Sequence, residues 1–403
     1  MISEEQLKTK ILEQLDLSRE VEDEELQELI FRVLEEESSR EYLSLEVRAK
    51  LGRELFNAFR KLDLLQELIE DEDITEVMIN GIQNIFVEKQ GKLYLTERHF
   101  MSREKLEDVI QQIVAGTNRL VNEASPIVDT RLSDGSRVNV VLYPVALNGP
   151  IVTIRKFPRE QMTMKRLVSL GALSEELAEC LRKLVEAGYN IFISGGTGSG
   201  KTTLLNALSQ YIPKDERIIT IEDNAELQIQ GVPNLVRLEA RNANVEGVGE
   251  ITIRDLIRSA LRMRPNRVIV GEVRGAETID MLQAMSTGHK GSLSTGHSDS
   301  PRDMLRRLET MVLMGMDIPL AAIQRQIASA IDIIIHIGRL WDKSRKVLEV
   351  VEVLDYNGEE IDTRILYRFE ETERKGDRVI GDWKKVQDLT NKEKLFSAGY
   401  TAL

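Results

Sequence analysis

The chain has 403 residues, of which 42% are apolar and 30% are charged. These proportions are typical of a globular protein with two or three domains. No apolar run approaches the ~18 residues of a membrane-spanning helix, and the N-terminus has no signal-peptide pattern. The single cysteine, Cys180, excludes a disulfide framework and a zinc site built from several cysteines. These features predict a cytoplasmic protein.

The net charge of −13 argues against a nucleic-acid partner, because neutralising phosphates requires a basic face. No direct contact with nucleic acid is therefore expected. The average charge does not settle local binding, because one basic cluster is present. It consists of Arg258, Arg262, Arg264, Arg267 and Arg274.

Residues 1–71 are predicted to form an acidic helical region. Apolar residues recur there at helical spacing, as Leu26, Ile30 and Val33 do. Ser38 and Glu41 have the spacing of a capping box, which predicts that a helix begins at this point. We interpret the acidic runs as solvated helix faces in preference to a docking surface.

Residues 72–157 are predicted to form a small α/β domain. Turn dipeptides such as Asn80-Gly81 and Asp134-Gly135 separate short runs with the alternation of strands. A helix is expected over 102–117. The strand-like runs are 75–79, 84–88, 91–95, 137–142 and 151–154.

Residues 158–165 are predicted to be a linker. Residues 166–403 are predicted to be a second domain in which helices alternate with apolar strands, with further strands toward the C-terminus. The strands expected there are 190–194, 217–221 and 267–270, with 293–297 and 331–337 as weaker candidates. This alternation predicts a parallel sheet with helices on both faces.

The most specific motif follows the apolar run 191–193 and precedes an apolar helical run. It fits the phosphate-binding pattern G-x-x-x-x-G-K-[ST], in which glycines let backbone N–H groups surround a phosphate. Lys201 is expected to reach the β- and γ-phosphates, and Thr202 to hold Mg²⁺. The sequence therefore predicts a site for a nucleoside triphosphate and Mg²⁺. Its residues are Gly195, Gly196, Thr197, Gly198, Ser199, Gly200, Lys201, Thr202 and Thr203.

Two carboxylates and a histidine follow other predicted strands. Glu222 and Glu272 each stand where a buried parallel strand ends, the edge at which α/β sheets bind ligands. Such acids can hold a Mg²⁺ shell or orient an attacking water, although each could instead cap the following helix. His297 lies in a segment rich in glycine and hydroxyl groups. It is a candidate to sense the γ-phosphate or to hydrogen-bond a catalytic acid, and the alternative is a structural histidine.

The four motifs in this order resemble those of the type II/type IV secretion ATPase superfamily. They are the Walker A loop at 195–203, the Asp box at 219–227, Walker B at 270–275 and the His box at 287–297. Residues 238–241 and 244–247 are similar to the CpaF-type branch, the motor of Tad pili. Three residues depart from the family's His box: Gly296, where the family more often has an apolar residue, and Ser298 and Asp299, where it more often has Ala-Asn.

The resemblance implies a RecA-like P-loop core, a smaller N-terminal α/β domain and a homohexameric ring. It also implies that Glu222 orients water, that Glu272 supports Mg²⁺ and that His297 contacts the γ-phosphate region. The two glutamate roles are exchangeable at this point. Arg137 and Arg155 best match the family's arginines from the smaller domain, and Arg131 is a third candidate.

The function expected from this resemblance is an ATPase that powers assembly of a Tad or type IV-like pilus, or a related secretion machine. Whether the same ATPase also drives pilus retraction is left open. The expected location is the inner face of the cytoplasmic membrane, with an integral platform protein as partner. A conjugation or type IV secretion ATPase is the nearest alternative. A RecA-like DNA-dependent ATPase and a nucleotide switch without turnover are the more distant ones.

Overall fold

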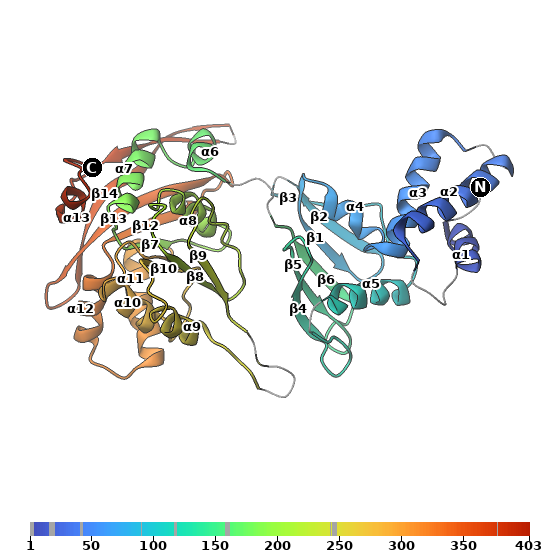
Figure 1. The fold of residues 1–403 in the computed structure, drawn as a ribbon. Coiled ribbons are helices and arrows are strands. Elements are labelled where there is room, and N and C mark those ends of the chain that lie inside the picture. Colours follow the sequence, from blue (N-terminus) through green and yellow to red (C-terminus); the bar gives the residue numbers. More distant parts are fainter. Residues whose placement is uncertain are drawn as a thin grey trace. The chain divides into compact units, whose positions relative to one another are not determined.

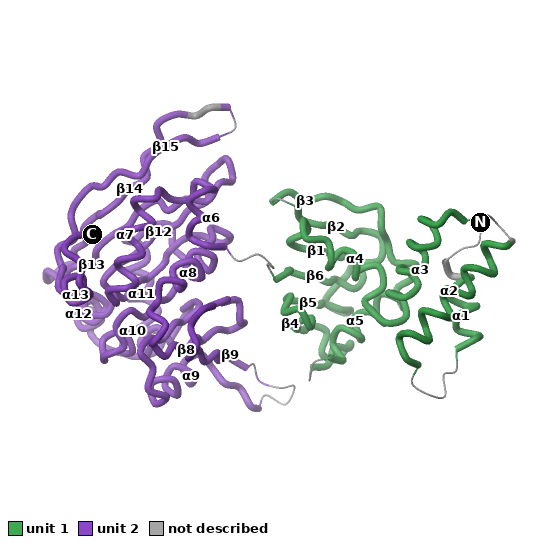
Figure 2. The backbone as a smooth tube through the Cα atoms, turned by 45° about the horizontal axis from the view of Figure 1, so that its top comes forward, with its two compact units in different colours: residues 1–160 green, residues 161–403 purple. Residues whose placement is uncertain are grey.

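The computed structural model describes residues 4–15, 21–40, 43–89, 91–116, 119–157, 162–241, 243, 248–376 and 378–403. The chain forms two compact units, 1–160 and 161–403, each built around its own sheet (Figure 2). Of the predicted linker 158–165, residues 158–161 lie outside the described part. Met164 and Lys165 already belong to a helix. Within the described ranges, no helix is both long and apolar enough to cross a bilayer.

Unit 1 begins with three helices that pack around an apolar core of their own, which includes Leu7, Leu26 and Leu55. The prediction of an acidic helical region is confirmed by α1 (Glu4–Gln14), α2 (Asp23–Arg40) and α3 (Leu45–Arg60). A fourth helix, α4 (Leu65–Glu70), instead packs into the core beneath the sheet.

The capping-box prediction at Ser38 was wrong. Ser38 lies inside α2, and the next helix begins after Ser44, whose side chain accepts a hydrogen bond from Val47 N at 3.3 Å. The Ser-x-x-Glu spacing is a purely local pattern, and it forms a capping box only when the backbone at the serine is not helical. At Ser38 the helix simply continues.

The sheet of unit 1 has the order β3-β2-β1-β6-β5-β4, and every neighbouring pair is antiparallel. Helix α5 (Arg103–Ala115) buries Leu106 and Ile110 in the same core as the inward-facing strand residues. Strand β4 (Ile127–Arg131) was not predicted from the sequence. The strands are β1 (Ile74–Asn80), β2 (Asn84–Lys89), β3 (Lys92–Leu95), β4 (Ile127–Arg131), β5 (Arg137–Val141) and β6 (Ile151–Arg155).

The sheet of unit 2 has the order β15-β14-β13-β12-β7-β11-β10-β8-β9. Its strands from β12 to β9 run parallel, and the β12–β15 end is antiparallel. The strands are β7 (Ile191–Ser194), β8 (Ile218–Glu222), β9 (Leu235–Glu239), β10 (Arg267–Val270), β11 (Leu293–Gly296), β12 (Ile333–Arg339), β13 (Arg345–Tyr356), β14 (Ile361–Lys375) and β15 (Arg378–Lys385).

Helices cover both faces of this sheet, as predicted (Figure 1). Alternate residues of the central strand β7 face opposite layers: Ile191 and Ile193 join one core, and Phe192 joins the other. One layer holds α6 (Met164–Ser169), α7 (Glu175–Glu186), α8 (Lys201–Ser209) and α13 (Glu393–Ser397). The other holds α9 (Ile253–Ala260), α10 (Thr278–Ser286), α11 (Pro301–Gly315) and α12 (Leu320–Ala330).

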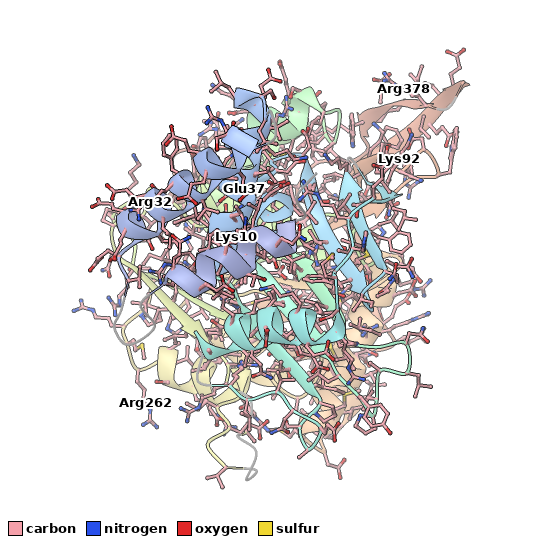
Figure 3. All side chains as sticks on the ribbon, turned by 90° about the vertical axis from the view of Figure 1, so that its right-hand side faces the viewer. Lys10, Arg32, Glu37, Lys92, Arg262 and Arg378 are labelled. Atoms are coloured by element: carbon pink, nitrogen blue, oxygen red, sulfur yellow. The ribbon has the colours of Figure 1, made fainter. Side chains whose placement is uncertain are left out.

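The five arginines grouped as a basic cluster from the sequence have different surroundings in the structure. Arg267 is buried and donates to Glu216 at 2.8 Å, and Arg258 donates to Asp280 at 2.9 Å. Arg274 pairs with Glu272, whereas Arg262 is exposed (Figure 3). Three of the five side chains thus neutralise acids of their own unit, which local sequence spacing does not reveal.

Candidate functional site

The glycine-rich loop joins the buried strand β7 to helix α8. Gly198 and Gly200 have φ values of +68° and +100°, a region that side chains other than glycine rarely adopt. A Cβ on Gly195 would lie 2.2 Å from the carbonyl oxygen of Ile337 on β12, so the loop lies directly against that strand. Open space surrounds the Cβ positions of Gly196 and Gly198. The loop therefore has glycines where geometry demands them and an uncovered backbone beside them.

Lys201 closes the loop from the first turn of α8. Its ammonium donates to the carbonyls of Gly195 and Gly196, at 3.1 and 3.0 Å. Burial lowers the pKa of this ammonium, and the nearby Glu272 carboxylate opposes that shift. A partly desolvated cation is thus held at the centre of the loop.

His297 links the lysine to the acid at the end of β10. Its Nδ1 lies 3.2 Å from Lys201 Nζ, and its Nε2 lies 2.8 Å from Glu272 Oε1. Burial is the main reason that the pKa of His297 is lowered, although the Glu272 charge raises it. The second oxygen of Glu272 accepts from Arg274 at 2.9 Å. The structure therefore brings together Lys201, His297 and Glu272 from three separate motifs.

Glu222 ends β8 and is only 3% exposed. Its Oε1 accepts the backbone N–H groups of Glu226 and Leu227, at 2.8 and 2.9 Å. Its Oε2 is buried and has no hydrogen-bond partner in the described structure. Burial raises the pKa of Glu222 to about 7, and the two backbone donors only partly offset that rise. A carboxyl with one free, dehydrated oxygen is positioned to exchange a proton near neutral pH.

Gly271 keeps Glu222 close to the Walker B segment. A Cβ at Gly271 would lie 2.8 Å from Glu222 Cγ, so only glycine leaves room for this acid beside the end of β10. Thr295 of β11 donates to the Gly271 carbonyl at 2.8 Å and fixes the turn. The two glutamates thus lie next to each other and have different environments.

Arg345 is a neighbour of the loop that the sequence did not predict. From β13 its Nε donates to the carbonyl of Gly198 at 2.8 Å. It is separated from the loop by more than a hundred residues of sequence, and no motif marks it. Only the pairing of β13 with β12, and of β12 with β7, carries it there.

The three candidate arginines of unit 1 form a row across adjacent strands. Arg131 of β4 is opposite Arg137 of β5, which is opposite Arg155 of β6. Directly opposed residues point to the same face of a sheet. Arg155 Nε also lies 3.5 Å from Glu76 Oε1. The structure therefore places these arginines together within unit 1.

The ionisation of Glu222 is expected to make stability pH-dependent. Because its pKa lies above the ordinary value of 4.5, the folded chain binds this proton more tightly than the unfolded chain. Wild-type stability should therefore fall by up to about 1.4 kcal/mol per pH unit as the pH rises through the window from about 4.5 to about 7. Glu222→Gln has no ionisable group at this position, so its free energy of unfolding should not show this decrease. Denaturant unfolding of both proteins at pH 5, 6, 7 and 8 measures the difference in their free energies of unfolding.

The stability gained by Glu222→Gln relative to wild type should grow up to about pH 7 and stay constant above it. Parallel stability curves for the two proteins over the whole range would contradict a buried, proton-binding Glu222.

A family model described as Type II/IV secretion system protein matches residues 59–387. Among curated proteins, the putative conjugal transfer protein Rv3659c of Mycobacterium tuberculosis is 34% identical over 301 residues, which covers 73% of this chain and 85% of the relative. The conjugal transfer protein TrbB of Rhizobium radiobacter is 31% identical and covers 77% of this chain and 93% of its own length.

Two solved structures share the fold. The ATPase DotB of Legionella pneumophila superposes with a TM-score of 0.52 at 24% identity, over 70% of this chain and 78% of its own. The pilus retraction motor PilT with bound ADP gives a TM-score of 0.53 at 21% identity, over 75% and 81%. The expected architecture, a RecA-like core with a smaller N-terminal α/β domain, is confirmed.

The finer assignment to the CpaF-type branch has no separate support from these relatives. Of its two segments, 238–241 spans the end of β9, and 244–247 lies outside the described residues. The superfamily itself rests on a model match over most of the chain and on relatives above 30% identity. The chain belongs to the type II/type IV secretion ATPase family.

Proposed function

We propose that this chain hydrolyses ATP with Mg²⁺ and works as a motor in a ring of identical subunits. The observation that carries the proposal is the contact series Lys201–His297–Glu272 at the mouth of the glycine-rich loop. Three sequence motifs meet there within hydrogen-bond distance, next to a buried glutamate with one unpaired oxygen.

The loop suits a polyphosphate. Gly196 and Gly198 leave their backbone uncovered, and Gly200 caps α8 in the left-handed conformation, so N–H groups at a helix N-terminus can face an anion. Lys201 adds a desolvated cation beside them. Each of these features stabilises negative charge, and a side chain at Gly195 could not be accommodated.

The residues present also suit Mg²⁺ that shares its ligands with phosphate. Among the described residues no group of three or more His, Cys, Asp or Glu side chains could hold a metal alone. Thr202 at the start of α8 and Glu272 at the end of β10 are the proposed protein ligands, directly or through water. The ion, when bound, would neutralise charge on the phosphates.

Glu222 is the proposed group that orients the attacking water. Its buried Oε2 has no partner, and burial raises its pKa to about 7. Glu272 Oε2 instead accepts from Arg274, and its buried Oε1 lies 2.8 Å from His297 Nε2, which bonds to it only when that nitrogen carries a proton. This difference favours Glu222 for water and Glu272 for the metal. His297 is the proposed sensor, because it contacts Lys201 and Glu272 at the same time.

Arg137 and Arg155 are the proposed arginines that complete the site. They are neighbours on one sheet face, and their guanidinium groups can stabilise charge that spreads over a transferred phosphoryl group. The family resemblance implies that they act within a hexamer, where a site is shared between subunits. Arg131 extends the same row and is a third candidate.

The machine that the motor serves has two candidates. The CpaF-like segments support a Tad or type IV-like pilus at the inner face of the membrane, with an integral platform protein as partner. Relatives at 31–34% identity are named conjugal transfer proteins, which favours a conjugation or type IV secretion machine. A RecA-like DNA-dependent ATPase is disfavoured by the net charge of −13.

The hydrolysis proposal is tested by steady-state ATP turnover on size-separated protein. Lys201→Ala and Glu222→Gln should lose nearly all activity, and Arg137→Ala should lose about 10³-fold. Mixing Lys201→Ala subunits with Arg137→Ala subunits should restore part of the activity, because a mixed ring regains intact shared sites. DNA should have no effect.

Arg103→Ala, an exposed arginine on α5, is the matched control and should retain wild-type turnover. Turnover by monomers that is insensitive to Arg137→Ala, or no recovery on mixing, would refute the shared site. Stimulation by DNA would favour the DNA-dependent alternative.

Arg345 is expected to position the loop without taking part in the chemistry. Arg345→Ala frees the Gly198 carbonyl, and loss of a hydrogen bond worth roughly 1 kcal/mol should raise KM for ATP about fivefold with kcat nearly unchanged. Arg339→Ala, whose residue is paired with Arg345 across β12 and β13, is the control. A fall in kcat with constant KM would contradict a positioning role.

The two candidate machines are separated in the source organism. A strain lacking the gene should lose surface pili, seen by electron microscopy, and wild type but not Glu222→Gln should restore them. Loss of conjugation with normal piliation would instead assign the chain to a conjugation machine.

A further inference from the structure

A groove of about 880 Å³ lies between α2 and α3 in unit 1, far along the sequence from the nucleotide site. Its apolar lining includes Ile30, Phe31, Leu45 and Phe56. Phe31 is 62% exposed and Leu45 is 76% exposed, although large apolar side chains on packed helices are normally covered. A contiguous apolar surface of this kind marks an interaction site.

The border of the groove is basic within an acidic region. Residues 1–71 carry twice as many acidic as basic side chains, yet α3 places Arg48, Lys50 and Arg53 along the groove. The lining also includes Lys61 and the two α4 acids Glu67 and Glu70, and both acids are already paired, Glu67 with Arg98 and Glu70 with Lys61. Lys50 lies 3.8 Å from Glu54 of its own helix. No ion pair of Arg48 or Arg53 is found among the described residues, so two cationic side chains can take an external carboxylate.

Arg48 provides a second indication. Its Nε is buried and has no hydrogen-bond acceptor in the described part of the chain. Leaving a buried N–H unpaired costs roughly 1–3 kcal/mol, and an acceptor supplied by an occupant would remove that cost. Among the described residues, the groove thus leaves apolar side chains exposed and two cationic side chains without an ion pair.

The shape of the groove selects a helix as its occupant. Both long walls are helices, whose backbone groups are already hydrogen-bonded internally, so no sheet edge is present for strand addition. The lining from Leu45 to Lys61 extends about 24 Å at 1.5 Å per residue, the length of roughly four helical turns. An occupant must bring apolar side chains along one stripe and satisfy its own backbone.

We propose that this groove binds an amphipathic α-helix of a partner protein that carries carboxylates along one edge of its apolar stripe. The apolar stripe covers Phe31 and Leu45, and the carboxylates pair with Arg48 and Arg53. An anionic membrane is a poorer occupant, because the surface is hollowed and the surrounding region is acidic. This proposal does not depend on the assignment of the nucleotide site.

The test uses full-length protein and two synthetic 20-residue helices labelled with fluorescein. Both peptides have leucines at i, i+3, i+4 and i+7; one carries glutamates beside them and the other lysines. By anisotropy the acidic peptide should bind at micromolar concentration, about tenfold or more tighter than the basic one. Phe31→Glu and Arg53→Glu should each weaken acidic-peptide binding about tenfold.

The matched controls lie outside the groove, one on the same helix as Phe31 and one on the neighbouring helix α1. Leu12→Glu on α1 and Arg32→Glu on α2 replace exposed side chains and should leave binding unchanged (Figure 3). All four variants should keep wild-type ATP turnover and circular dichroism. A failure of the groove proposal can therefore be distinguished from a failure of the hydrolysis proposal.

Three outcomes would overturn the proposal. The first concerns the peptides: neither binds, or both bind equally, or Phe31→Glu does not weaken binding of the acidic peptide. The second is that phosphatidylglycerol vesicles bind wild type and lose that binding in Phe31→Glu, which would assign the groove to a membrane. The third is a change of oligomeric state in Phe31→Glu, which would assign it to a second copy of the chain.

Discussion

The parallel register of β7, β11, β10 and β8 is the constraint on which the nucleotide site depends. Ser194 lies opposite Gly296, and Val270 lies opposite both Ser294 and Ile221. The carboxyl ends of these strands therefore meet at one edge, where the loop, His297, Glu272 and Glu222 follow. A register shift of one residue would turn every side chain of a strand to the opposite face of the sheet. Because apolar side chains are buried on both faces, the packing of these two layers fixes the observed register.

Burial then gives the two glutamates different chemistry. Glu222 is enclosed, accepts two backbone N–H groups and has a pKa raised to about 7. Glu272 lies between Arg274 and His297 at the open side of the same edge. Two carboxyl groups at one edge of the sheet thus differ in burial and in the partners that contact them. This asymmetry is the physical basis for assigning water to one and the metal to the other.

The chain also separates its chemistry by unit. The phosphate-binding loop and both glutamates lie in unit 2, whereas the arginine row and the apolar groove lie in unit 1. The proposed motor function requires both a site that senses nucleotide and a surface that delivers force to another protein. Variants on the groove and variants on the loop therefore report on different properties of one molecule.

The sequence by itself determined the glycine-rich loop, the order of the acidic motifs and the helix and strand periods, because these are local patterns with fixed spacing. It missed β4 and β9, set a helix start wrongly at Ser38 and grouped as one cluster arginines that pair with different acids. Only the tertiary structure decided that Arg345 holds Gly198, that Glu222 keeps one oxygen unpaired and that α2 and α3 leave a groove. Those features arise from contacts between distant segments and from burial, which local spacing does not encode.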